Sequence, residues 1–150
     1  MHRIGVISDT HRLVRPEALT ALRGVEHIIH AGDIGFPSVV DSLRRIAPVT
    51  AVRGNVDYGD HYPETAVVEL GGALIHVIHN IDDLDLDPRA AGFSAVIYGH
   101  SHIAAQETHD GVLYFNPGSA GPRRFHLPVS IGYLTVRGRK VSGEIVYLGM

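Results

Sequence analysis

The chain has 150 residues, which fits one domain spanning 1–150, and its 45% hydrophobic and 19% charged residues are typical of a globular protein. The formal net charge of −3 argues against a strongly basic nucleic-acid binder, and the absence of cysteine excludes disulfides, thiolate metal sites and cysteine nucleophiles. Since the apolar runs are far shorter than the roughly 20 residues that span a bilayer, and no signal-peptide pattern opens the chain, we expect a cytoplasmic protein without membrane contact.

The first third of the chain alternates short apolar runs with amphipathic segments. The apolar runs at 4–7, 27–30 and 49–52 have the length and composition of strands buried on both faces. Pro16 and Pro37 can each open a helix, because the fixed φ of proline suits the first helical turn. This alternation of strand and helix predicts a parallel α/β unit.

The rest of the chain is richer in strands. The expected strands there are 66–70, 73–78, 95–98, 129–136 and 140–148. Gly71-Gly72 and Asp110-Gly111 are favoured two-residue turns and predict hairpins. A short helix is expected to start at Pro88, with Asp87 as its cap.

Polar clusters follow five of these strands or extended runs, and they hold many of the eleven histidines. The clusters are Asp9-Thr10-His11, Gly32-Asp33, Gly54-Asn55, His79 and Gly99-His100-Ser101-His102. Because ligands of open α/β sheets bind at the carboxyl ends of the strands, we expect the clusters to converge. Asp9 and His11 are two residues apart, as are His100 and His102, and extended backbone would project each pair to one side.

The collected side chains are two aspartates, one asparagine and four histidines. Oxygen and imidazole ligands without sulfur suit Mn²⁺, Fe²⁺, Zn²⁺, Ni²⁺ or Co²⁺. Seven groups are too many for one metal with an open position, so they suit two metals that share a bridging carboxylate. His76 competes with His79 for one position, and we favour His79 because it lies near the end of its strand. His30 either supports Asp33 from behind or packs as a core histidine.

The order of these motifs resembles the calcineurin-like metallophosphoesterase superfamily. Asp-x-His, Gly-Asp, Gly-Asn, a single His and Gly-His-x-His follow one another in this order between residues 9 and 102, and the similarity covers nearly the whole chain. The opening Ile-Gly-Val-Ile-Ser-Asp-Thr-His, the stretch His-Ala-Gly-Asp-Ile and Asn116-Pro117-Gly118-Ser119 narrow the similarity to the small YfcE-type phosphodiesterase subgroup. The resemblance implies a single-domain α/β fold, a two-sheet β-sandwich flanked by helices.

The resemblance also implies a role for each ligand by its position. The first metal would be held by Asp9, His11 and His102, the second by Asn55, His79 and His100, and Asp33 would bridge them. Asp33, Asn55 and His79 are accordingly the expected catalytic residues. The expected cofactors are two divalent metal ions, with Mn²⁺ the first choice and Fe²⁺, Ni²⁺, Co²⁺ or Zn²⁺ as the others.

The activity implied is hydrolysis of a small phosphate ester, in the first place a phosphodiester, by a hydroxide on two metals that attacks phosphorus in line. Arg12, Arg53, Arg123 and Arg124 lie beside motifs and are candidates for neutralising the phosphate. Many superfamily members have a histidine directly after the Gly-Asn, where it is thought to protonate the leaving group. Here that residue is Val56, so we expect slow chemistry or a preference for good leaving groups.

Two other functions remain open at this point. The same small fold resembles the vacuolar sorting subunit of the retromer coat, a non-enzymatic protein-binding scaffold, but degraded ligands would favour that role and none of the seven is degraded here. A phosphomonoesterase or a nuclease would use the same site, although the net negative charge argues against long nucleic acids as partners. A homodimer is expected by analogy alone.

Overall fold

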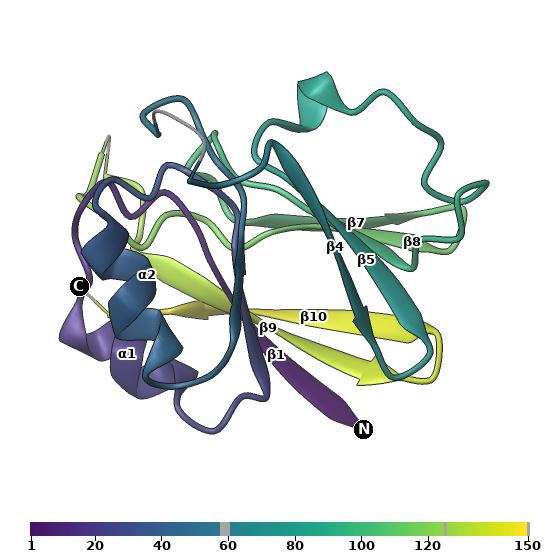
Figure 1. Ribbon diagram of the computed structural model, residues 1–150, viewed down its shortest axis with the longest axis horizontal. Coiled ribbons are helices and arrows are strands. Elements are labelled where there is room, and N and C mark those ends of the chain that lie inside the picture. Colours follow the sequence, from purple (N-terminus) through teal and green to yellow (C-terminus); the bar gives the residue numbers. More distant parts are fainter. Residues whose placement is uncertain (58–60, 125, 150) are drawn as a thin grey trace.

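The computed structural model describes residues 1–57, 61–124 and 126–149 (Figure 1). Their elements are β1 (His2–Ile7), α1 (Pro16–Leu22), β2 (His27–His30), α2 (Pro37–Arg44), β3 (Val49–Ala51), β4 (Thr65–Leu70), β5 (Ala73–Ile78), the 3₁₀ helix η1 (Ile81–Asp83), β6 (Ala95–Ile97), β7 (Ala105–His109), β8 (Val112–Asn116), β9 (Ser130–Arg137) and β10 (Lys140–Tyr147). The strands form two five-stranded sheets that pack face to face, which confirms the predicted sandwich. Both described α-helices cover the outside of the first sheet (Figure 1).

The first sheet has the strand order β10-β9-β1-β2-β3. β1 and β2 are parallel, as are β2 and β3, so the predicted parallel unit is confirmed. Pro16 and Pro37 are the first residues of α1 and α2, as their fixed φ predicts. The hairpin of β9 and β10 adds antiparallel strands beyond β1.

The second sheet has the order β4-β5-β6-β8-β7. β5, β6 and β8 run parallel, while the hairpins β4-β5 and β7-β8 are antiparallel. Gly71-Gly72 and Asp110-Gly111 form the turns of these hairpins, as predicted. The carboxyl ends of three parallel strands in each sheet are thus available for a shared site.

Apolar side chains fill two main layers. Val6, Ile75 and Phe115 are fully buried between the sheets, and Leu22 and Leu43 are fully buried between the helices and the first sheet. Each such side chain contributes about 1.5–3 kcal/mol by leaving water. No helix among the residues that the structure describes is long and apolar enough to cross a bilayer.

The segment between β5 and β6 differs from the prediction. No helix starts at Pro88; the chain makes turns there, with the Phe93 N–H donating to the Pro88 carbonyl at 2.9 Å. Asp87 caps this turn and not a helix as predicted, since its Oδ1 accepts from the N–H groups of Arg89 and Ala90 at 3.1 and 3.4 Å. The stretch is too short for a helix to propagate past its unfavourable first turn, because Ser94 already pairs with the sheet.

Candidate metal centre

Polar residues at the ends of the parallel strands join the two sheets at one edge of the sandwich. From the first sheet come Asp9, Asp33 and Asn55, and from the second come His79, His100 and His102, while His11 follows Asp9 in the loop after β1. The His79 Nδ1–H donates to the carbonyl of Ala31 at 2.7 Å, and the His100 N–H donates to Asp9 Oδ2 at 3.1 Å. The structure therefore brings the seven sequence-predicted site residues together.

The loops that carry these residues are not extended, so that expectation was wrong. Positive φ angles occur at Asp9 (55°), His11 (45°), Asp33 (56°), His100 (74°) and His102 (65°). Such left-handed backbone costs about 1–3 kcal/mol for each residue other than glycine, and it clusters at functional sites. Here it is held by backbone bonds between the loops, from the Asp9 N–H to the Gly32 carbonyl and from the His11 N–H to the Asp33 carbonyl, both at 2.9 Å. Left-handed turns, and not alternation along a strand, aim the paired side chains.

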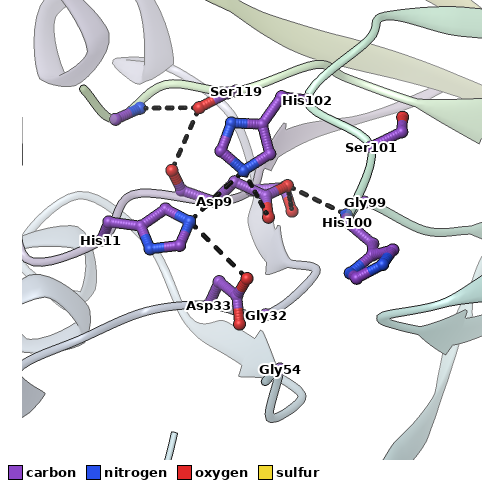
Figure 2. A network of polar contacts seen from close by, with 12 residues as sticks. Asp9, His11, Gly32, Asp33, Gly54, Gly99, His100, Ser101, His102 and Ser119 are labelled. Carbon is purple, nitrogen blue, oxygen red and sulfur yellow. Dashed lines mark hydrogen bonds and ion pairs between the residues drawn. The ribbon is translucent and has the colours of Figure 1, made fainter. Parts of the chain in front are cut away.

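Asp9, His11 and His102 form a first group of candidate ligands, whose donor atoms lie within 4.8 Å of one another. Figure 2 shows the three side chains pointing toward one another: the Nε2 atoms of the histidines are 3.3 Å apart, and His102 Nε2 is 3.5 Å from Asp9 Oδ1. Asp9 is fully buried, and its Oδ2 accepts from Ser8 Oγ–H and the His100 N–H, whereas its Oδ1 has no hydrogen-bond partner among the residues that the structure describes. An unpartnered carboxylate oxygen facing two imidazole nitrogens fits a divalent cation.

Asp33 links this group to a second group of candidate ligands, which consists of Asn55, His79 and His100. Its Oδ1 accepts from the Val56 N–H at 3.0 Å, while its Oδ2 lies 3.6 Å from His11 Nε2 and 3.3 Å from His79 Nε2. Because the Nδ1–H of His79 is committed to the Ala31 carbonyl, Nε2 is the ring nitrogen that faces Asp33. One oxygen of Asp33 thus lies between imidazoles of both groups, as a bridging ligand requires.

Asn55 and His100 stand on the open side of the second group. Asn55 Oδ1 accepts from His100 Nδ1 at 3.1 Å, and the His100 ring meets the His79 ring edge-on, with 5.2 Å between centroids. Both side chains are exposed, so an amide oxygen and an imidazole are available beside His79. The competing histidine, His76, lies within β5 and packs against Phe93 instead.

The electrostatics of the site suit a cation. Burial raises the pKa of Asp9 to about 6, because this carboxylate lacks a full counter-charge. Burial alone would raise the pKa of Asp33 as well, but the contacts from His79 and the Val56 N–H outweigh it and hold that pKa well below its usual value. Burial lowers the pKa of His102 to about 4, which keeps its ring neutral and free to ligate.

His30 supports the site from behind, which decides between the two roles that the sequence left open. It is fully buried, its Nδ1 accepts from the Gly32 N–H at 3.1 Å, and its Nε2 lies 3.0 Å from Thr10 Oγ1. Thr10 in turn donates to the Ile34 carbonyl at 2.9 Å. His30 therefore fixes both loops that carry the aspartates.

Asp57 is a site residue to which the sequence analysis gave no role. Its carboxylate accepts from the N–H groups of Ile34, Gly35 and Gly54 at 3.0, 3.0 and 2.9 Å. It thereby fastens the loop after β2 to the loop after β3. An aspartate within a glycine-containing turn commonly accepts backbone N–H groups, and this pattern was the available signal.

Asn116 and Ser119 belong to the Asn-Pro-Gly-Ser motif, and their side chains form hydrogen bonds with two other loops of the site. Asn116 Nδ2 donates to the Gly99 carbonyl at 3.1 Å and to Ser101 Oγ at 3.2 Å. Ser119 Oγ–H donates to the Asp9 carbonyl at 3.1 Å (Figure 2). The end of β8 thus positions the loops after β1 and β6.

Two glycines allow the backbone to approach the aspartates closely. A Cβ on Gly54 would lie 2.2 Å from Asp33 Oδ1, and one on Gly99 would lie 2.1 Å from Ser8 Oγ and 2.8 Å from Asp9 Oδ2. Any side chain at these positions would displace a candidate ligand, which explains the glycine before each of Asn55 and His100.

The four candidate arginines have different surroundings. Arg53 forms a 2.6 Å ion pair with Glu64, and the guanidinium of Arg12 lies 5.1 Å from the centre of the Phe36 ring. Burial is the main cause that lowers the pKa of His11 and of His102. The positive charge of Arg124 lowers both pKa values further. Of the four candidate arginines, Arg124 is the one that contributes to both of these pKa shifts.

Comparison with known proteins shows the family of this chain. The calcineurin-like phosphoesterase superfamily domain matches residues 2–139, and the chain belongs to this superfamily of metal-dependent phosphoesterases. A probable metallophosphoesterase of Methanothermobacter thermautotrophicus is 34% identical to this chain over an alignment of 164 residues, gaps included. The alignment covers 97% of this chain and 92% of that protein.

Solved structures share the fold at lower sequence identity. An archaeal phosphodiesterase superposes with a TM-score of 0.78 at 24% identity, over 96% of this chain and 99% of its own. Vps29 from Chaetomium thermophilum superposes with a TM-score of 0.79 at 19% identity, over 97% of each chain. These likenesses confirm the two-sheet architecture.

Proposed function

We propose that the protein is a phosphodiesterase that hydrolyses small phosphate diesters with two divalent cations, Mn²⁺ in the first place. The observation that carries the proposal is the position of Asp33 Oδ2, 3.6 Å from His11 Nε2 and 3.3 Å from His79 Nε2. The buried atoms Asp9 Oδ1 and His79 Nε2 support it as well, since neither has a hydrogen-bond partner within the described ranges 1–57, 61–124 and 126–149. Buried polar atoms are rarely left in this state unless something absent from the chain satisfies them.

In this proposal each candidate ligand has a place. Asp9, His11 and His102 would hold the first cation, Asn55, His79 and His100 the second, and Asp33 both. When bound, the two cations would act as Lewis acids toward the phosphoryl oxygens and would lower the pKa of a water. We assign Arg124 to the remaining phosphate charge, because its own charge acts on His11 and His102.

Other groups of the chain orient these ligands. At position 56, the valine side chain has no proton to donate. The Ala31 carbonyl fixes the ring of His79, and the Val56 N–H fixes Asp33. Because a valine side chain cannot protonate a leaving alkoxide, we expect nitrophenyl esters to be cleaved much faster than alkyl esters. The likeness to Vps29 favours a scaffold as the second candidate, but the presence of all seven candidate ligand residues in the sequence argues for the enzyme.

The test is hydrolysis of bis-p-nitrophenyl phosphate by chelator-treated protein with and without added Mn²⁺. We expect activity only with the metal, two bound ions per chain by elemental analysis, and a loss of about 100-fold or more in Asn55→Ala and His100→Ala. His109→Ala, an exposed histidine paired with Glu107, is the surface control and should keep full activity. No hydrolysis with Mn²⁺, Fe²⁺, Co²⁺, Ni²⁺ or Zn²⁺ would reject the enzyme and favour the scaffold.

A further inference from the structure

A pocket of about 340 Å³ opens beside the first group of candidate ligands. Its described lining consists of His11, Arg12, Gly35, Phe36 and Val56. His11 is a candidate metal ligand, and the Val56 N–H donates to Asp33 Oδ1 at 3.0 Å, so the pocket begins at the metal centre. This volume lies in the range of small-molecule sites. One ester group of a phosphate held at the centre would therefore reach this pocket.

Two apolar side chains of the pocket are accessible to a ligand. Phe36 is 52% exposed and Val56 is 37% exposed, and they lie together at the rim of a polar site. Apolar side chains that gather in this way mark ligand contacts more often than those scattered singly over a surface. A ligand group that covers both would remove their apolar area from water. The pocket thus favours an uncharged, apolar ester group.

Arg12 adds a fixed cation to the same pocket. Its backbone is left-handed, with a φ of 78°, and its N–H donates to the Ile34 carbonyl at 2.9 Å. A Cβ on Gly35 would lie 2.4 Å from the Arg12 nitrogen and 2.5 Å from its Cγ, so the arginine packs on a glycine that no other residue could replace. The guanidinium lies 5.1 Å from the centre of the Phe36 ring, within the range of a cation–π interaction. Because guanidinium and phenyl groups both pack against π faces, this pair favours an aromatic ligand.

No described side chain of the pocket can protonate a leaving oxygen. Phe36 and Val56 carry no ionisable proton, an arginine stays protonated in proteins, and His11 is a candidate metal ligand. Hydrolysis adds a hydroxide to phosphorus and breaks the bond to the ester oxygen, which leaves with the electron pair. An alkoxide needs a proton at that moment, whereas an aryl oxide spreads its charge over the ring and needs none. The guanidinium of Arg12 can stabilise the charge of such an oxide. The chemistry of the pocket therefore agrees with its shape.

We infer that this pocket receives the leaving group of the substrate, and that the substrate class is a phosphodiester of a phenol-type alcohol. The inference rests on the proposed phosphodiesterase function and names the substrate class for that site. The aromatic ring packs against Phe36 and Val56, which makes them the specificity-determining residues. The guanidinium of Arg12 lies near the aryl oxygen, and the phosphate is held at the metal centre.

The experiment separates recognition of the ring from leaving-group chemistry. The monomethyl esters of phenyl-, cyclohexyl- and methylphosphonic acid are monoanions like a phosphodiester, and they carry the group under test on a P–C bond that hydrolysis does not break. Each is titrated into Mn²⁺-loaded wild-type protein, and its Kd is measured by calorimetry. We expect the phenyl compound to bind about 10-fold more tightly than the methyl compound because its ring is buried, and about 3-fold more tightly than the cyclohexyl compound because of its π face.

Matched variants locate the ring in the protein. Phe36→Ala should reduce the phenyl-to-methyl ratio of affinities to about 2-fold. Val56→Thr, which keeps the shape of the side chain and the backbone N–H to Asp33, should reduce the ratio to about 5-fold. Val67→Ala, at an apolar side chain of β4 that is 55% exposed and lies outside the pocket, should leave the ratio unchanged.

Hydrolysis of bis-p-nitrophenyl phosphate with Mn²⁺ is measured on the same protein samples. Phe36→Ala should raise KM about 5-fold and change kcat little, since it removes a contact to the ring and no ligand of the centre. Metal-dependent hydrolysis together with equal affinities for the three phosphonates would overturn this inference and leave the proposed function standing. A phenyl preference that Phe36→Ala does not change would also overturn it, because the ring would then bind elsewhere. Absence of hydrolysis would overturn the proposed function, and the inference with it.

Discussion

Buried polar residues that are not themselves candidate ligands determine where the ligands lie. Asp57 accepts three backbone N–H groups from the loops after β2 and β3, and His30 connects Gly32 with Thr10. Such bonds let the loops keep left-handed backbone at Asp9 and Asp33 that isolated residues would avoid. At this scale, the site depends as much on its supporting residues as on its ligands.

His30 makes the stability of the protein dependent on pH. Burial lowers its pKa to about 4, whereas the same histidine in the unfolded chain has its ordinary value of 6.5. Between these values the unfolded chain binds a proton that the folded chain does not, so this contribution is present above pH 6.5 and is lost as the pH falls toward 4. The loss should amount to roughly 3 kcal/mol.

The measurement is urea unfolding of chelator-treated protein from pH 7.5 to 4. The difference in unfolding free energy between wild type and His30→Gln should shrink steadily as the pH falls, since glutamine keeps a donor and an acceptor but does not titrate. Leu13→Ala, at an exposed leucine that does not titrate, is the control and should give a difference that does not change with pH. A constant difference for His30→Gln would mean that His30 is not held neutral in the fold.

At the scale of the elements, the short helices owe their stability to packing. α1 has 7 residues and α2 has 8, lengths at which an isolated helix is not stable in water. Leu22 of α1 and Leu43 of α2 are fully buried against the first sheet. The apolar face, and not the intrinsic propensity, holds these helices on the sheet.

Leu22→Ala tests this view. We expect the unfolding free energy to fall by about 2–5 kcal/mol, because the substitution leaves a cavity under α1. Metal-dependent activity at a temperature where the variant is folded should remain unchanged, since the candidate ligands lie in the loops at the ends of the strands and not on α1. Leu13→Ala, at an exposed leucine, should lower the unfolding free energy by less than about 1 kcal/mol.

The elements also show what the sequence could and could not predict. Apolar runs and hairpin turns predicted the strands, because burial and turn chemistry are local properties. The position of the polar clusters after strands predicted that they would meet. The left-handed turns at Asp9 and His100, and the bonds from Ile34 and Gly35 to Asp57, depend on contacts between distant loops, which no local pattern contains.

At the scale of the whole molecule, the site is a junction between the two sheets. Asp9, Asp33 and Asn55 belong to the ends of the first sheet, whereas His79 and His100 belong to the second. Cations bound between them would tie the sheets together, and the buried Asp9 would gain the counter-charge that it lacks. Metal binding should therefore stabilise the entire sandwich and not only its loops.

This coupling predicts the effect of Mn²⁺ on thermal unfolding. At a concentration 100 times the dissociation constant, a cation that binds only the folded state adds about 2.7 kcal/mol, which should raise the Tm of a chain of this size by about 5–10 °C. Asp33→Asn should abolish most of the rise, because it removes the shared ligand of both groups. Asp41→Asn, an exposed aspartate of α2, should keep the full rise, so an equal rise in both variants would show that the cations bind elsewhere.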